Sequence, residues 1–316
     1  EHLAHMDAMM MPTAMHPWMR SLEEMRLWPH EYSPVYEAYN RIFDCRGHGW
    51  ANLQSAHLNL PFANEAEFGR LHAAIRLAAS APVIDGVLTG SLDTRMHVYR
   101  FNAARIPSIA AAIVPEAVFT YDDYEEQIFE RMYADIAPHD PKGILRYEWL
   151  NSRGAIARFD RGAIEIRVLD MQECPAADLA VLWLIAAALR RLTEGSQSSY
   201  QEQKSFSTEA LAKLLLDVIK GGDRTRVLDA RYLAALGLGK YLSMRAGEVW
   251  QELFEQLPDS PVKAEHMPAL KIIFNKGCLA RRIIAAAGRR PEMKKLRRVY
   301  GELCACLADN RMFGAR

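Results

Sequence analysis

A glutamate and an arginine stand two positions apart in the stretch GAIEIRVLD, residues 162–170. Because side chains alternate along a β-strand, Glu165 and Arg167 would share one face and the aliphatic residues between them the other. A carboxylate binds hard cations such as Mg²⁺, and a guanidinium group binds phosphate or carboxylate through paired hydrogen bonds. The stretch therefore predicts either an edge strand with a solvated ion pair or a strand that presents both groups to a cleft.

A second stretch, WANLQSAHLNLPF at residues 50–62, aligns polar side chains along one face of an expected strand. Alternation places Ser55, His57 and Asn59 on the same face as Leu53. A lone histidine in a strand is usually structural. The polar side chains in line with His57 favour the other interpretation, in which this face is directed toward a cleft.

Arginines are concentrated in two further stretches, LDTRMHVYR at 92–100 and EWLNSRGAIARFDRGAIEIRVLD at 148–170. Arginine is the preferred side chain for bidentate binding of carboxylate and phosphate. Their anions could be ligand phosphates and a substrate carboxylate, beside Mg²⁺ held by Glu165, or they could be the protein's own carboxylates. The sequence has no GxxxxGK[ST] loop, so side chains and metal would have to hold any nucleotide. The arginines are Arg95, Arg100, Arg153, Arg158, Arg161 and Arg167, and the internal candidates are Asp93, Asp160, Glu165 and Asp170.

The elements that must position these residues change in type near residue 175. Strands are expected at 9–15, 50–60, 96–101 and 162–169, and helices at 65–80, 122–136, 176–193, 207–220, 245–256, 268–287 and 291–308. Strands followed by helices, without βαβ alternation, predict an α+β fold with a mostly antiparallel sheet lining a cleft. We expect a single catalytic domain over residues 1–316, with a sheet-rich cleft part at 1–175 and a helical part at 176–316 packed on it.

The overall composition excludes several classes of protein. The chain has 316 residues, half of them hydrophobic, with 39 acidic and 39 basic side chains. A formal net charge of zero argues against a nucleic-acid partner. The longest apolar run, Leu179–Leu189, is shorter than the roughly 20 residues that cross a bilayer, so it predicts a buried helix and no membrane partner. Five cysteines without CxxC spacing predict reduced thiols in the cytoplasm.

Three of these stretches resemble strands of the glutamine synthetase superfamily. IEIRVLD looks like the strand whose glutamate binds a metal and whose arginine binds the reacting group, and NSRGAIAR resembles the paired arginines upstream of it. SAHLNLP resembles the His-x-His strand, with His57 in the second position and Ser55 in the first. The order PTAMHPWM, NLQSAHLNLP, LDTRMHVYR, EWLNSRGAIARF and IEIRVLD is similar to the glutamate–cysteine ligase 2 family of carboxylate–amine ligases.

The resemblance implies a glutamine synthetase-like fold and a cytoplasmic ligase that uses ATP with Mg²⁺ or Mn²⁺. In this chemistry ATP phosphorylates the γ-carboxylate of glutamate, and an amine such as cysteine displaces the phosphate. Glu165 and His57 would bind the metal, and Arg153 and Arg167 would have catalytic roles. The resemblance leaves open whether the chain forms a homo-oligomer. Nucleotide contacts would come from Arg158, His57, Arg95 and Arg100.

Two departures from the family pattern keep alternatives open. The family begins with a strand carrying Glu-x-Glu, which nothing before His2 can provide, so we expect that strand to be missing from the chain as given. Ser55 replaces the first histidine of the His-x-His strand. The alternatives are a ligase or phosphotransferase of the same fold with another substrate, and a non-catalytic binding protein that lacks the full set of metal ligands.

Overall fold

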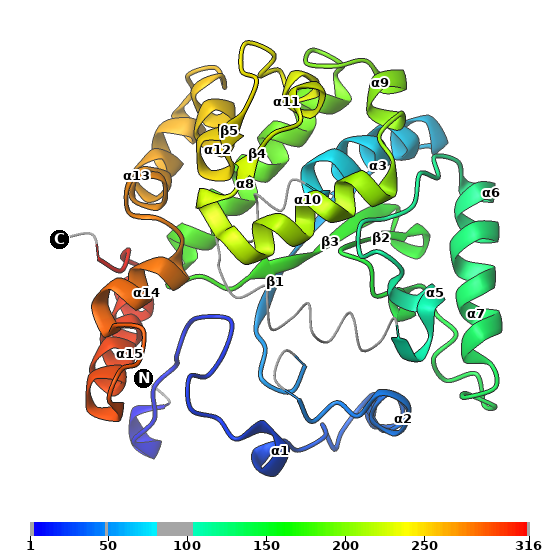
Figure 1. The fold of residues 1–316 in the computed structure, drawn as a ribbon. Helices are drawn as coiled ribbons and strands as arrows, with labels where there is room; N and C mark the ends of the chain where they lie inside the picture. Colours follow the sequence, from blue (N-terminus) through cyan, green and yellow to red (C-terminus); the bar gives the residue numbers. More distant parts are fainter. Residues whose placement is uncertain (1–2, 48–49, 81–103, 315–316) are drawn as a thin grey trace.

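A three-stranded antiparallel sheet lies at the centre of the computed structural model, which describes residues 3–47, 50–80 and 104–314 (Figure 1). The strands follow the order β1–β3–β2, with bounds Ser55–Pro61, Ala163–Asp170 and Ala155–Arg158. β3 is therefore the central strand of this sheet, with a neighbour on each side. The alternative of an edge strand with a solvated face is wrong for β3.

The pairing of β1 with β3 contains a β-bulge close to Glu165 and Arg167. Asn59 of β1 lies opposite Glu165 of β3. The register shifts between Ala56 and Leu58, where β3 contains one residue more than β1. Such bulges change the direction of nearby side chains and are frequent next to binding sites. This one adjoins Arg167.

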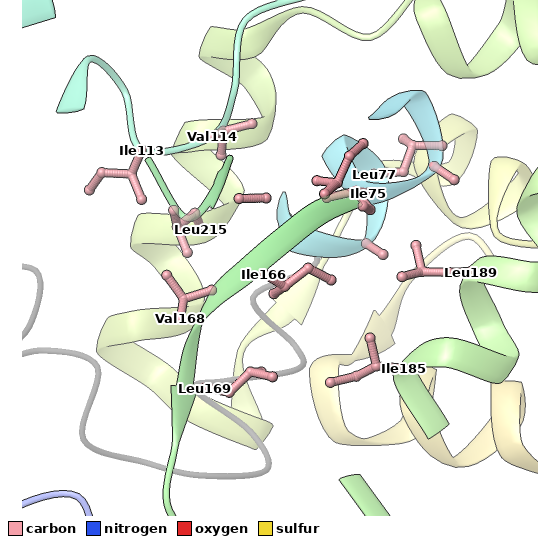
Figure 2. Packing of buried hydrophobic residues seen from close by; sticks show 14 of the residues in the cluster. Ile75, Leu77, Ile113, Val114, Ile166, Val168, Leu169, Ile185, Leu189 and Leu215 are labelled. Carbon is pink, nitrogen blue, oxygen red and sulfur yellow. The ribbon is translucent and has the colours of Figure 1, made fainter. Parts of the chain in front are cut away.

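One face of the sheet is covered by helices and forms the main hydrophobic core. α3 (Glu65–Ser80) contacts β3, α8 (Pro175–Thr193) contacts β1, and α10 (Thr208–Gly221) packs on α3. Figure 2 shows Ile166 of β3 pointing toward Ile185 of α8. Since the alternate residues of β3 enter this core, its polar residues are directed to the opposite face.

The core is shared by both parts of the chain. One hydrophobic cluster extends from Ala38 of α2 (Ser33–Phe43) to Met312 near the end of the described chain. The single-domain organisation stays a prediction, and the shared core favours it. The remaining elements after α8 are α9 (Tyr200–Lys204), η6 (Gly222–Arg224), β4 (Arg226–Val227), α11 (Ala230–Ala235), β5 (Met244–Arg245), α12 (Ala246–Glu255), α13 (Pro261–Lys276), α14 (Leu279–Ala287) and α15 (Met293–Ala308).

A second, smaller hydrophobic cluster joins α14 and α15 to the N-terminal segment. Its buried members include Leu303 and Phe313, and Trp18 packs against it. Arg282 of α14 forms a buried ion pair with Glu173, which follows β3. The ion pair therefore links this cluster to the end of the central strand.

Most of the expected helices are confirmed with ends close to those predicted. The run at 122–136 is continuous, although it combines α6 (Tyr121–Tyr124), a π-helical stretch η3 (Glu125–Glu130) and α7 (Arg131–Ile136). The Ser207 hydroxyl accepts a hydrogen bond from the Ala210 backbone N–H and so caps α10. The predictions confirmed in this way are 65–80, 122–136, 176–193, 207–220, 245–256 and 291–308.

The prediction of one helix over 268–287 is wrong. Ser260 caps α13, and Pro261 occupies its first turn, so the helix begins earlier than expected. Pro268 lies inside α13. Gly277 then adopts a φ of +87°, a conformation that favours glycine and ends the helix, and α14 starts after it.

The prediction of a strand at 9–15 is also wrong. The segment contains Pro12, which lacks a backbone donor, and Thr13 has a φ of +86°. The Asn52 side chain accepts a hydrogen bond from the His16 N–H and donates one to the His16 carbonyl. The Asn52 side chain and one backbone hydrogen bond, from the Gln54 N–H to the Ala14 carbonyl, thus hold this segment in place of a strand ladder. The remaining elements before β3 are η1 (Ala4–Met6), α1 (Ser21–Glu24), α5 (Pro107–Ala110), η4 (Glu148–Leu150) and η5 (Phe159–Arg161).

The apolar run Leu179–Leu189 is confirmed as part of a largely buried helix, α8. Among the described helices, none has the length and apolar character needed to cross a membrane. The expected strand at 96–101 lies outside the described residues.

Replacing the core residue Leu184 of α8 with alanine tests this packing. Leu184 is fully buried, so Leu184→Ala should lower the free energy of unfolding by about 3 kcal/mol through lost burial and the cavity left behind. Urea unfolding measures the change. Leu179→Ala on the exposed side of the same helix is the matched control, because Leu179 is 55% exposed. Equal losses in the two variants would contradict the assigned orientation of α8.

Candidate active site

A cleft of about 880 Å³ lies against the face of the sheet that the core helices leave uncovered. α2 lies on this side of the sheet, opposite α8 (Figure 1). Charged side chains from the three strands, from Glu148 of η4 and from η5 form the floor, and aromatic side chains from α2, from Trp50 and from residues 147–149 form a wall. The lining residues that matter for its chemistry are Tyr36, Tyr39, Trp50, Ser55, His57, Tyr147, Glu148, Trp149, Arg158, Asp160, Arg161 and Arg167.

Glu165 lies just beneath this floor and is only 5% exposed. Its Oε1 is 3.1 Å from Arg167 Nε and 3.4 Å from His57 Nδ1, and its Oε2 is 3.6 Å from Arg158 Nη1. The hydrogen bond from His57 holds the pKa of Glu165 below its usual value, helped by both guanidinium charges and opposed by burial. The carboxyl group is therefore ionised near neutral pH.

His57 connects the buried glutamate to the cleft. Its Nδ1 faces Glu165, and its Nε2 lies 3.2 Å from the Ser55 hydroxyl. The serine at the first position of the expected His-x-His pattern thus contacts the histidine at the second. His57 and Glu165 were predicted to lie near one cleft, and the structure brings them together.

Arg158 is surrounded by three carboxyl groups. Its Nε and Nη2 bind the two oxygens of Asp160 at 3.1 and 2.9 Å. Nε is also 3.4 Å from Glu148 Oε2, while Nη1 approaches Glu165. One guanidinium group therefore connects the carboxyl groups of Glu148 and Glu165.

Glu148 is a residue that the sequence analysis missed. Both of its oxygens accept a hydrogen bond from the Asp160 backbone N–H, at 3.3 and 3.4 Å. Burial and the neighbouring Asp160 carboxylate raise the pKa of Glu148 to about 7. Hydrogen bonding to Glu148 and to Arg158 lowers the pKa of Asp160 to about 2. Near neutral pH, Asp160 is ionised and Glu148 is divided between its two forms. A signal was present, since Glu148 is the first residue of the arginine-rich stretch 148–170.

Arg167 is held at the floor from two sides. Its Nη1 donates to the Asn151 carbonyl at 2.8 Å, in addition to the contact with Glu165. The Asn151 side chain accepts from Arg153 Nη1 at 3.0 Å and donates to the Tyr124 hydroxyl at 3.0 Å. The side chain of Arg167 is 26% exposed, so a ligand in the cleft can reach it.

Arg153 is not brought into the cleft. It is 1% exposed, and its Nε and Nη2 bind the two oxygens of Glu116 at 2.5 and 2.6 Å. Arg153 is therefore paired with one of the protein's own carboxylates, which is one of the two alternatives considered for the arginines. Its partner, Glu116, was not among the candidates named from the sequence. The catalytic role of Arg153 stays a prediction. The geometry favours a positioning role, in which Arg153 fixes Asn151 and Asn151 fixes Arg167.

Arg95 and Arg100, which the sequence analysis assigned to nucleotide binding, lie outside the described residues. Their roles stay predictions. Arg161 lies at the cleft, with a side chain that is 59% exposed and 3.8 Å from Asp160. It adds a third guanidinium group to Arg158 and Arg167.

The fit to a divalent cation rests on two donors. Within residues 3–47, 50–80 and 104–314, no three His, Cys, Asp or Glu side chains are grouped closely enough to hold a metal ion by themselves. Glu165 supplies a carboxylate and His57 a ring nitrogen. Mg²⁺ commonly binds one or two carboxylates and completes its shell with substrate phosphates and water. The described residues fit such a shared site rather than a site built by protein ligands alone.

The aromatic wall faces the charged floor. The rings of Tyr147 and Trp149 are stacked, with centroids 5.5 Å apart and planes at 12°. Tyr39 joins them to Trp50, with centroid distances of 6.0 Å to Trp149 and 5.4 Å to Trp50. Burial raises the pKa of Tyr39, against the opposite effect of Arg167, so its hydroxyl stays neutral. The cleft therefore combines a flat, apolar side with a polar one.

Fold and site together define a protein of mixed helix and antiparallel sheet with a charged cleft for small molecules. The chain belongs to the glutamate–cysteine ligase family 2, whose family model matches residues 3–300. The carboxylate of Glu165, the ring of His57 and the guanidinium groups of the cleft are compatible with membership of that family.

An uncharacterized protein from Archaeoglobus fulgidus is 38% identical to this chain over 184 residues. The match includes 56% of this chain and 49% of the relative, so the chain spans about half the length of the curated relative it matches. No solved structure matches the chain. The glutamine synthetase-like arrangement therefore stays a proposal, while a mixed fold with a small antiparallel sheet is confirmed.

Replacing Arg153 separates a positioning role from direct ligand binding. Arg153→Met removes one partner of a largely buried ion pair and should lower the free energy of unfolding by about 3 kcal/mol, measured by urea unfolding. Arg161→Met is the matched control, because the Arg161 side chain is mostly exposed and its loss should leave stability nearly unchanged. An Arg153→Met protein of unchanged stability with impaired ATP binding would favour direct contact with a ligand instead.

Proposed function

We propose that this protein is an ATP-dependent carboxylate–amine ligase that joins the γ-carboxylate of glutamate to an amine such as cysteine. The observation that carries the proposal is the environment of Glu165, an ionised carboxylate beneath a cleft with Arg158, Arg167 and His57 around it. Membership of the glutamate–cysteine ligase family 2 supports the same conclusion.

The reaction requires activation of a poor electrophile. A carboxylate does not react with an amine directly, so ATP first converts it to an acyl phosphate, and the amine then displaces phosphate. Catalysis of phosphoryl transfer depends mainly on positioning and on positive charge around the phosphate oxygens. The floor has three guanidinium groups against three carboxyl groups. One of those, Glu148, is partly neutral because its pKa is raised to about 7, so the balance favours an anionic ligand.

The geometry suggests a role for each residue. Arg167, fixed by Glu165 and Asn151, would contact the phosphoryl group as it is transferred. Arg158 and His57 would contact the nucleotide phosphates. Glu165 and His57 would hold Mg²⁺ or Mn²⁺, which when bound neutralises phosphate charge. Arg95 and Arg100 remain proposed nucleotide contacts.

Glu165→Gln is the direct test of this assignment. The variant keeps the shape of the side chain but removes its charge, so the rate of ADP release with ATP, Mg²⁺, glutamate and cysteine should fall by at least about 100-fold. His57→Ala should lower the rate less, because it removes a contact to phosphate or metal but leaves the carboxylate. The full-length protein is used, and urea unfolding verifies that each variant is folded.

Glu194→Gln is the matched control for this substitution. Glu194 follows α8, its side chain is 54% exposed, and its partner is the surface residue Arg190, whose side chain is 80% exposed. Its turnover should equal that of the wild type. A wild-type rate for Glu165→Gln would exclude β3 from the active site. Wild-type protein that binds ATP but releases no ADP with glutamate and any amine would indicate a binding protein of this fold.

A further inference from the structure

The arrangement of carboxyl groups around Arg158 assigns a role to Glu148. We infer that Glu148 is the general base that takes a proton from the acceptor amine, in an amine subsite completed by Asp160, Tyr147 and Trp149. The inference rests on the proposed ligase function and names the residue that serves its second step. All four side chains line the cleft.

The second step needs a base because an alkyl amine is an ammonium ion near neutral pH and has no free electron pair. One proton moves from the ammonium nitrogen to the Glu148 carboxylate, which leaves a neutral amine. The nitrogen electron pair forms the C–N bond, and the bond between the acyl carbon and the phosphate oxygen breaks. Inorganic phosphate leaves with that electron pair and takes up the second proton from nitrogen. Atoms and charge balance without a further reactant.

Glu148 lies where this proton transfer would occur. Arg158 contacts Glu148 through Nε and Glu165 through Nη1, so only one guanidinium group separates the two carboxyl groups. Glu165 marks the proposed phosphoryl end of the cleft. An amine beside Glu148 would therefore be close to an acyl group activated above Glu165.

The neighbours of Glu148 are suited to a cation. Asp160 stays ionised because its pKa is about 2, and its side chain is half-exposed beside Glu148. Tyr147 and Trp149 flank Glu148 in sequence and stack on each other, and aromatic rings attract ammonium ions. Asp160 and the rings would thus hold the ammonium ion while Glu148 accepts its proton.

The protonation of Glu148 suits this task. Its pKa of about 7 results from burial and from Asp160 of η5, with Arg158 of β2 acting in the opposite direction. Tyr133 of α7 also faces it, and burial keeps that phenol neutral. Arg146, in the loop before η4, faces the same phenol. General bases are most effective when their pKa lies near the working pH. The ionised, active form increases as pH rises through about 7.

A comparison of two nucleophiles distinguishes the role of Glu148 as a base from any effect on formation of the acyl phosphate. Cysteine must lose a proton before it attacks, whereas hydroxylamine is neutral near pH 7 and traps the acyl phosphate as a hydroxamate without a base. In Glu148→Gln, amide formation with cysteine should fall by at least about 100-fold, while hydroxamate formation continues at the wild-type rate. In the wild type, the ratio of the cysteine rate to the hydroxylamine rate should rise with pH through about 7. In Glu148→Gln the ratio should not level off near pH 7 but keep rising, because only cysteine that is already deprotonated in solution can then react.

Two further variants complete the experiment. Glu148→Asp retains a carboxyl group and should recover part of the rate with cysteine. Such a recovery would show that the loss in Glu148→Gln results from the missing carboxyl group and not from misfolding. Glu130→Gln, an exposed residue of η3, is the matched control and should not differ from the wild type.

The possible results are distinguishable. Equal loss of both products in a folded Glu148→Gln protein would mean that Glu148 only positions Arg158, and unchanged rates for both would exclude it from the reaction. Either result overturns the inference while the ligase function stands. Wild-type protein that forms neither hydroxamate nor amide would overturn the ligase function itself.

Discussion

The architecture of the cleft depends on the burial of one carboxylate. An ionised carboxyl group taken out of water is stable only when opposite charges and hydrogen bonds replace its hydration. Glu165 obtains these from Arg158, Arg167 and His57, which belong to all three strands of the sheet. The three strands must therefore lie in the observed register before the charge is balanced. Since β3 is the central strand, it can receive partners from both neighbours.

The partners of Glu165 are themselves held by further polar contacts. Arg167 needs the Asn151 carbonyl, and the Asn151 side chain is fixed by Arg153 and Tyr124. Arg153 in turn is balanced by Glu116. Polar groups buried behind the cleft thus form a connected chain of contacts in which each member is satisfied, as buried polar groups generally must be. The charged floor and the buried interior are parts of the same network.

Sequence reasoning succeeded where a local pattern determines the outcome. Alternation along 162–170 correctly placed Glu165 and Arg167 together, and the helical pattern located most of the expected helices. It failed where the role of a residue depends on a partner that is distant in the sequence. Arg153 and Arg158 look equivalent in NSRGAIAR, but the fold brings the distant Glu116 to Arg153, whereas Arg158 binds its sequence neighbour Asp160, which had been named as a candidate partner. Strand β2 is four residues long, too short for its period to be recognised. The raised pKa of Glu148 depends on burial and on Asp160, neither of which its immediate sequence neighbours indicate.

The separate cluster of α14 and α15 has a consequence for motion. These helices follow the break at Gly277 and have their own small core, which Arg282 joins to the end of β3 through Glu173. Segments with a small core and few links to the rest open as cooperative units at a lower free energy than the global transition. Backbone amides of α15 would therefore exchange with solvent deuterium before those of β3. Repeated opening of this helix pair would leave the cleft floor intact, so thermal fluctuation at the C-terminal end would be separate from fluctuation around Glu165.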